Sequence, residues 1–114
     1  GHGLEMARAS GTRFVFYARA LPVLDGALEL ARGGVETGGA AHNRRFVASS
    51  LSVAESVPED AVTLAHDPQT SGGLLAAIPP AAAPAILDGL RAAGVSAWTI
   101  GRVETASSPG VALA

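Results

Sequence analysis

The fold is decided by residues 67–80, Asp67-Pro68-Gln69-Thr70-Ser71-Gly72-Gly73-Leu74-Leu75-Ala76-Ala77-Ile78-Pro79-Pro80, in which a polar turn runs into a short apolar segment. Pro68 fixes its own φ and restricts the residue before it to extended backbone. Residues 74–78 are short and apolar enough for a strand that is buried on both faces. The two prolines then end this strand and begin a helix. The stretch therefore predicts a turn, a buried strand and a helix in succession.

The polar half of this stretch carries the groups from which a binding site can be built. The carboxylate of Asp67 either caps the turn by accepting backbone N–H bonds or faces an active-site cleft. Thr70 and Ser71, followed by Gly72 and Gly73, can present O–H and N–H donors to a phosphate, because consecutive amides in a turn form an anion-binding concavity. The alternative is an ordinary turn between two core elements. Either glycine is expected to have a positive φ or to abut another backbone.

A second polar cluster lies at Asn43 and Arg44, which precede a further arginine. Adjacent arginines on a loop are usually solvated surface charge, but in a cleft a guanidinium fork suits phosphate oxygens. Neither this cluster nor the turn is apolar enough for the core, and each interrupts regular structure. We therefore expect Asn43 and Arg44 to face Asp67, Thr70 and Ser71 across one cleft at the edge of the domain.

Apolar spacing elsewhere predicts a mixed order of helices and strands. Ser56 and Glu59 have the spacing of a capping box. Strands at 74–78 and 96–103 would form a right-handed β-α-β unit if they are parallel in one sheet. In chain order we expect a helix ending at Ser10-Gly11, a strand over 13–17, a helix over 23–32, a long loop over 34–45, a helix over 57–65, the strand 74–78, a helix ended by Gly94, a strand over 96–103 and a last strand over 111–113 that pairs back.

Composition limits the classes of function. The 114 residues suit one domain, with 48% hydrophobic and 16% charged residues and a formal net charge of −2, which favours neither nucleic acid nor an anionic membrane as a partner. The eight basic residues are all Arg and there is no Cys. A lysine-based phosphate contact and a cysteine nucleophile are therefore excluded within this chain. The three histidines lack the spacing of metal ligands, so we expect no metal site.

Four blocks of sequence in order resemble the selenide, water dikinase (selenophosphate synthetase) family. The string Asp67-Pro68-Gln69-Thr70-Ser71-Gly72-Gly73 is similar to the family's DPQTSGG signature. Residues 1–7 resemble its GHLLEMA helix, with Gly3 in place of a leucine, and residues 21–31 resemble its PLLPGALELA helix. Residues 38–47 are similar to its GGTRRNREYV loop, with Ala40 where the family has a threonine. The resemblance extends from residue 1 to about residue 104.

This resemblance implies both a fold and a role. The fold would be the C-terminal domain of the aminoimidazole ribonucleotide synthetase-related superfamily, an α+β domain with helices layered on a mixed sheet (α/β/α) and partly ferredoxin-like. Residues 1–114 would be a single domain of a longer cytoplasmic enzyme, whose own N-terminal ATP-binding domain is its partner within a homodimer. That enzyme would use ATP, Mg²⁺ and selenide to make selenophosphate, AMP and phosphate.

The same resemblance places the family's reactive Cys or Sec, its lysine and most of its metal-binding aspartates in the N-terminal domain. We therefore expect no catalytic residue, no bound cofactor and no activity in this chain alone. Asp67, Thr70, Ser71, Gly72, Gly73, Asn43 and Arg44 remain the candidates that face substrate or phosphate. The alternatives are the C-terminal domain of another ATP-using member of the superfamily, similar to thiamine-monophosphate kinase or a hydrogenase-maturation protein, or a non-catalytic interaction domain.

Overall fold

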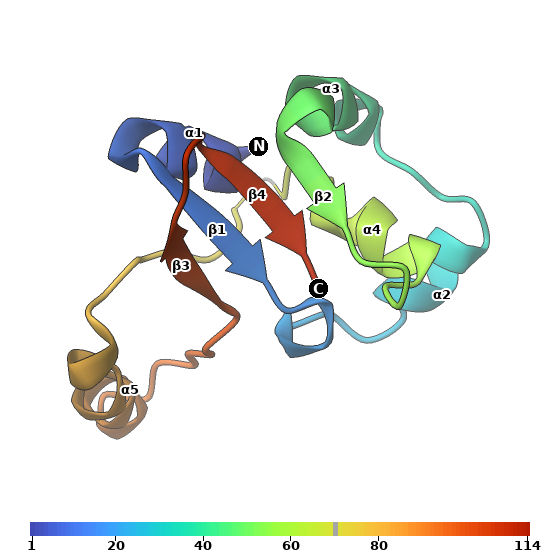
Figure 1. Ribbon diagram of the computed structural model, residues 1–114. Helices are drawn as coiled ribbons and strands as arrows, with labels where there is room; N and C mark the ends of the chain where they lie inside the picture. Colours follow the sequence, from blue (N-terminus) through green and yellow to red (C-terminus); the bar gives the residue numbers. More distant parts are fainter. Residues whose placement is uncertain (70) are drawn as a thin grey trace.

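The computed structural model describes residues 1–69 and 71–114 (Figure 1). Helices and strands alternate irregularly along the chain, as expected for the α+β class. In order they are α1 (His2–Ser10), β1 (Thr12–Phe16), η1 (Ala18–Ala20), α2 (Ala27–Arg32), α3 (Gly38–Val47), η2 (Ala48–Ser50), β2 (Leu51–Val53), α4 (Glu59–Ala65), η3 (Pro80–Ala82), α5 (Ala83–Ala92), β3 (Gly101–Thr105) and β4 (Gly110–Leu113).

The strands form one mixed sheet in the order β2-β4-β1-β3. β1 is antiparallel to β3, with Phe14 opposite Val103. β1 is also parallel to β4, with Phe14 opposite Val111, and β4 is parallel to β2. The predicted α+β class with a mixed sheet is thereby confirmed.

One face of the sheet carries the hydrophobic core. Leu4 and Ala7 of α1 pack with Phe14, Val47 and Val111, which joins α1 and α3 to the two central strands. A second cluster lies further along the same face, because alternate strand residues point the same way. It brings α4 and η1 onto the ends of β1 and β4 through Ala18, Val62 and Leu113.

The other face of the sheet turns toward the viewer in Figure 1, with α1 and α4 behind it. It carries charged and hydroxyl side chains around the buried Val15 and Ala112. Arg13 of β1 reaches across β4 to donate to Ser52 Oγ of β2, at 2.6 Å. Arg102 of β3 donates to Tyr17 Oη at 3.0 Å and to Glu104 Oε1 at 2.7 Å. The hydrogen bond to Tyr17 has the larger effect and the one to Glu104 the smaller, and both raise the pKa of the Arg102 guanidinium. The helices that bury the core all lie on the other side of the sheet from these polar side chains. The core is therefore one sheet and one layer of helices, whereas α/β/α layering would add helices on this face.

Helix ends that depend on a glycine or a proline were predicted correctly from the sequence. Gly11 ends α1 with φ 65°, in the left-handed conformation that glycine adopts without strain, and its N–H caps the carbonyl groups of Ala7 and Arg8. The helix predicted after the two prolines forms as η3 and α5, and Gly94 follows it with φ 73°. The helix expected over 57–65 is α4, which begins at Glu59.

Two local predictions were wrong. The long loop expected over 34–45 is largely the helix α3, because Ala40 and Val47, seven residues apart, are buried on one side of it. Tertiary packing thus outweighs the two glycines at its start. The capping box is absent, since Pro58 occupies the N-cap of α4 and no side chain caps that helix.

The strands of the C-terminal half also differ from expectation. Residues 74–78 have no regular structure, and the strand predicted over 96–103 begins only at Gly101. The expected β-α-β unit is therefore not formed. The free edges of the sheet belong to β2 and β3, so a further strand would have to pair with one of these two strands. The last strand does not pair back on β3 but lies parallel between β1 and β2.

Candidate functional site

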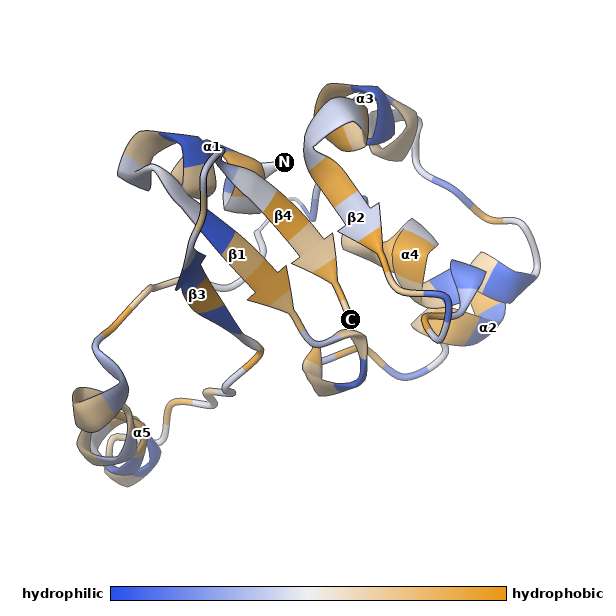
Figure 2. Cartoon of the chain, viewed as in Figure 1, coloured by the Kyte–Doolittle hydropathy of each residue, from blue (hydrophilic) through white to orange (hydrophobic). Residues whose placement is uncertain are grey.

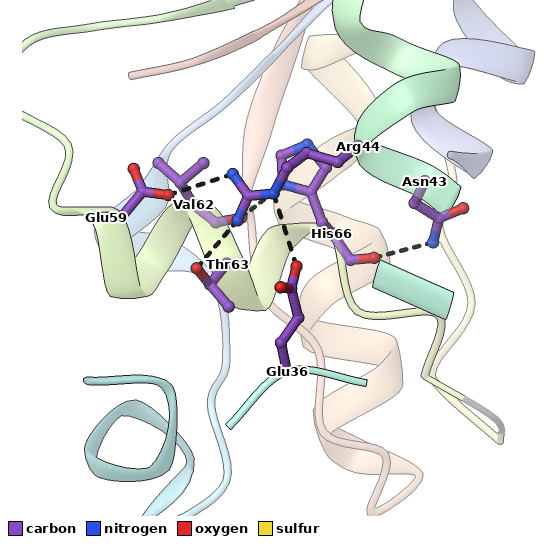
Figure 3. Close-up of polar contacts among 7 residues, drawn as sticks. All are labelled: Glu36, Asn43, Arg44, Glu59, Val62, Thr63 and His66. Atoms are coloured by element: carbon purple, nitrogen blue, oxygen red, sulfur yellow. Dashed lines mark hydrogen bonds and ion pairs between the residues drawn. The ribbon is translucent and has the colours of Figure 1, made fainter. Parts of the chain in front are cut away.

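The turn of residues 67–73 is hereafter called the signature turn, and its start lies beside α3. Asn43 Nδ2 of α3 donates a hydrogen bond of 2.9 Å to the carbonyl oxygen of His66, which immediately precedes the turn (Figure 3). A Cβ built on Gly39 would come within 2.7 Å of Pro68 Cγ, so α3 and the turn are in close contact. The His66 ring is buried, with Nδ1 2.7 Å from the carbonyl oxygen of Val62.

Arg44, the next residue of α3, is bound to carboxylates. Its Nη1 lies 3.2 Å from Glu59 Oε1 and its Nε lies 3.6 Å from Glu36 Oε1. Its Nη2 donates to Thr63 Oγ1 at 3.1 Å. Figure 3 shows the guanidinium over α4, on the other side of the helix end from the Asn43 contact. To bind a phosphate, Arg44 would have to exchange these partners for the ligand.

Within the signature turn, Asp67 makes a local hydrogen bond. Its Oδ1 accepts the backbone N–H of Gln69 at 2.8 Å, and the N–H of Gly72 donates to the carbonyl oxygen of Gln69 at 2.9 Å. Asp67 is half-buried and Ser71 is exposed. Thr70, the remaining hydroxyl of the predicted site, lies outside the described residues. The structure therefore assigns Asp67 a turn-capping contact at the base of an exposed loop.

The positive φ angles expected at the glycines lie elsewhere in the turn. Gln69 has φ 47° and Ser71 has φ 76°, whereas neither Gly72 nor Gly73 has a positive φ. The expected close approach to another backbone group is found at Gly72 and not at Gly73. A Cβ on Gly72 would lie 3.2 Å from the carbonyl oxygen of Gln69, while a Cβ on Gly73 would meet nothing within 4 Å. Left-handed backbone at two non-glycine residues costs about 1–2 kcal/mol each, so the turn is strained.

Sequence reasoning missed the residues that hold Arg44. Glu59 and Thr63 are four residues apart on α4, which places them on one helix face, and this spacing was a usable signal. Glu36 lies outside any regular element and gave no signal. Among the described residues, no three His, Cys, Asp or Glu side chains are grouped so as to hold a metal ion. The arrangement thus offers backbone and hydroxyl donors in an exposed turn, with one carboxylate at its base.

The chain matches a known domain family along nearly its whole length. Residues 1–113 match the family described as "AIR synthase related protein, C-terminal domain". A mixed sheet with helices packed on it is consistent with that domain. The chain belongs to this family.

Curated relatives give the comparison more detail. The chain is 36% identical over 104 residues to "Selenide, water dikinase 2" of Peptoclostridium acidaminophilum, which covers 90% of the chain and 30% of that protein. It is 40% identical over 113 residues to "Selenide, water dikinase" of Nitratidesulfovibrio vulgaris (strain DSM 19637 / Miyazaki F), covering 99% of the chain and 32% of that protein. The chain therefore spans about a third of the length of the curated relatives it matches. None of the helices in residues 1–69 and 71–114 is long and apolar enough to cross a membrane.

Proposed function

We propose that this chain is the C-terminal domain of an ATP-dependent selenide, water dikinase, which makes selenophosphate, AMP and phosphate. The observation that carries this proposal is the alignment with proteins of that name, at 36% and 40% identity over 90% and 99% of the chain. The enzyme would be cytoplasmic and homodimeric, with this domain packed against its own N-terminal, ATP-binding domain. Residues 1–114 would be one domain and would have no activity by themselves.

The chemistry divides between the two domains. Mg²⁺ would neutralise charge on the transferring phosphoryl group, as is general for phosphoryl transfer. The resemblance places most of the family's metal-binding aspartates in the N-terminal domain, so that domain would hold most of the ligands of the ion. This chain would contribute by positioning the substrate. The amides of the exposed residues Ser71 and Gly73 would donate to an anionic substrate, while the Gly72 N–H closes the turn on Gln69 and Asn43 fixes its start.

A domain exchange tests the assignment of the domain. Residues 1–114 would replace the matching C-terminal third of the Peptoclostridium acidaminophilum relative, and the chimera would be assayed for selenide-dependent formation of AMP from ATP. We expect turnover by the chimera and none by residues 1–114 alone, because this chain has neither Lys nor Cys. A folded, dimeric chimera without turnover, or selenide-dependent turnover by the isolated chain, would contradict the proposal.

A substitution within the chimera tests the signature turn separately. Asp67→Asn keeps an oxygen that can accept the Gln69 N–H bond but removes the charge. We expect at least a tenfold loss of kcat with an unchanged melting temperature, since the turn stays capped. Asp25→Asn, at an exposed position before α2, is the matched control and should leave both unchanged. If the two variants behave alike, the site assignment fails while the domain assignment stands.

A further inference from the structure

His66, the residue just before the signature turn, holds the C-terminal end of α4 through its ring. A helix leaves its last four carbonyl groups without α-helical partners. The carbonyl oxygen of Val62 is one of these in α4, and Nδ1 of His66 lies 2.7 Å from it (Figure 3). Because a carbonyl oxygen can only accept, Nδ1 carries the hydrogen and the ring donates. The His66 side chain therefore caps the last turn of α4.

The backbone leaves α4 through a tightened turn that accompanies this cap. With the Val62 carbonyl bound by the ring, the N–H of His66 donates instead to the carbonyl oxygen of Thr63, at 3.1 Å. The N–H of Asp67 donates to the carbonyl oxygen of Leu64, at 3.0 Å. Both bonds join residues three apart, the spacing of a 3₁₀ turn. The ring contact thus belongs to the geometry that places Asp67 directly after the helix.

The backbone carbonyl group of His66 forms a second tie, to another helix. Asn43 Nδ2 of α3 donates to it at 2.9 Å, so one residue is bonded to α4 by its ring and to α3 by its carbonyl oxygen (Figure 3). His66 is buried, with 4% of its surface accessible. A buried donor or acceptor that loses its partner pays its desolvation cost in full. The two bonds therefore fix the start of the signature turn against two helices.

The far end of the signature turn is not held in this way. It continues into residues 74–100, hereafter the arm, which consist of η3 and α5 with an irregular segment on each side. Figure 1 shows α5 beyond the β3 edge, apart from α1, α3 and α4, and Figure 2 shows apolar residues in both irregular segments. Leu74, the first residue of the arm, is fully exposed. The orientation of the turn therefore depends on the contacts at its start.

We propose that His66 is a positioning residue for the signature turn. Its ring bond to Val62 and its carbonyl bond to Asn43 set the direction in which the chain leaves α4, and so direct the amides of Ser71 and Gly73 toward an anionic substrate. His66 acts through the turn and does not touch the substrate, because its ring is buried. This inference rests on the function proposed above, in which those amides bind the substrate.

The first test measures the order of the turn in residues 1–114, without any assay of activity. His66→Phe keeps an aromatic ring and removes the donor, whereas His66→Asn restores a donor, because the amide nitrogen of asparagine is as far along the side chain as Nδ1 of histidine. The measurement is the backbone order parameter from ¹⁵N relaxation, which reports motion in the folded state and does not depend on global stability. His42→Phe, at an exposed histidine of α3, is the matched control.

We expect order parameters of about 0.85 for residues 67–69 and 71–73 in the parent, and values below about 0.6 in His66→Phe. His66→Asn and His42→Phe should resemble the parent, and the strand β1 should be unchanged in every variant. His66→Leu also removes the donor and takes the place of His66→Phe if the latter does not fold. A turn that stays ordered without the donor, or a loss of order that His66→Asn does not reverse, would overturn the proposal.

The second test uses the chimera with the N-terminal part of the Peptoclostridium acidaminophilum relative. His66→Phe should lower kcat for selenide-dependent AMP formation roughly tenfold, because misplaced binding groups reduce the rate of the reaction step. The KM for ATP should change less than about twofold, and His66→Asn should restore kcat. An unchanged kcat with a disordered turn would overturn the positioning role. A parent chimera without turnover would contradict the proposed function alone, and the order parameters would still decide whether His66 holds the turn.

Discussion

Replacing Arg44 by Met should lower the free energy of unfolding by about 1–3 kcal/mol. The two ion pairs of Arg44 are partly exposed, with side-chain accessibilities of 37% for Arg44, 41% for Glu36 and 78% for Glu59. Exposed pairs contribute about 0.2–1 kcal/mol each, and the hydrogen bond to Thr63 adds about 0.5–1.5 kcal/mol. The methionine keeps most of the aliphatic packing. The expected fall in Tm is about 4 °C per kcal/mol for a chain of this length.

Urea unfolding of the isolated chain measures this effect. Arg45→Met is the matched control, since Arg45 is the neighbouring exposed arginine and makes no ion pair among the described residues. The loss in Arg44→Met should shrink in 0.5 M NaCl, where exposed charges are screened. A double-mutant cycle with Glu59→Gln should give a coupling of about 0.5 kcal/mol. Equal stability of the two arginine variants would refute the view that Arg44 ties α3 to α4.

Two further substitutions test the core. Leu4→Ala should cost about 3 kcal/mol in urea unfolding, because Leu4 is fully buried and the loss includes a cavity term; Leu30→Ala, at an exposed position of α2, should change stability by less than about 0.5 kcal/mol. Gly3→Leu should destabilise by about 1–3 kcal/mol, since a Cβ there would lie 2.7 Å from the Phe16 ring, and should cost less when combined with Phe16→Ala. Simple additivity of that pair would contradict the predicted contact.

The sequence predicted best those elements whose ends are set by local chemistry. Gly11 and Gly94 end helices with positive φ, and Pro80 begins one, so each boundary depends on a single residue type. α3 was missed because its glycine-rich start has low helix propensity, and only packing of Ala40 and Val47 makes it helical. The apolar run 74–78 predicts a strand, but apolarity alone cannot reveal whether a partner strand is available.

In the candidate site, too, local patterns were predictive and contacts between distant residues were not. Polar character and loop position led us to expect Asn43 near the signature turn, and the structure places its side chain on the carbonyl group of His66. The partners of Arg44 were not predicted, because the spacing of Glu59 and Thr63 shows that they share a helix face but does not show that this face meets Arg44. Likewise, glycine marks where positive φ is easy, but the turn has its positive φ angles at Gln69 and Ser71.

The strained turn and the exposed arm are consecutive in the chain, and this order links them physically. Gln69 and Ser71 are held in left-handed conformations only a few residues before Leu74, where the arm begins. Such strain persists where surrounding contacts fix the backbone. Asp67 and Asn43 fix the start of the turn, whereas its far end leads into the unpacked arm. Any surface that buries residues 74–78 would therefore also fix the far end of the signature turn and orient its donors.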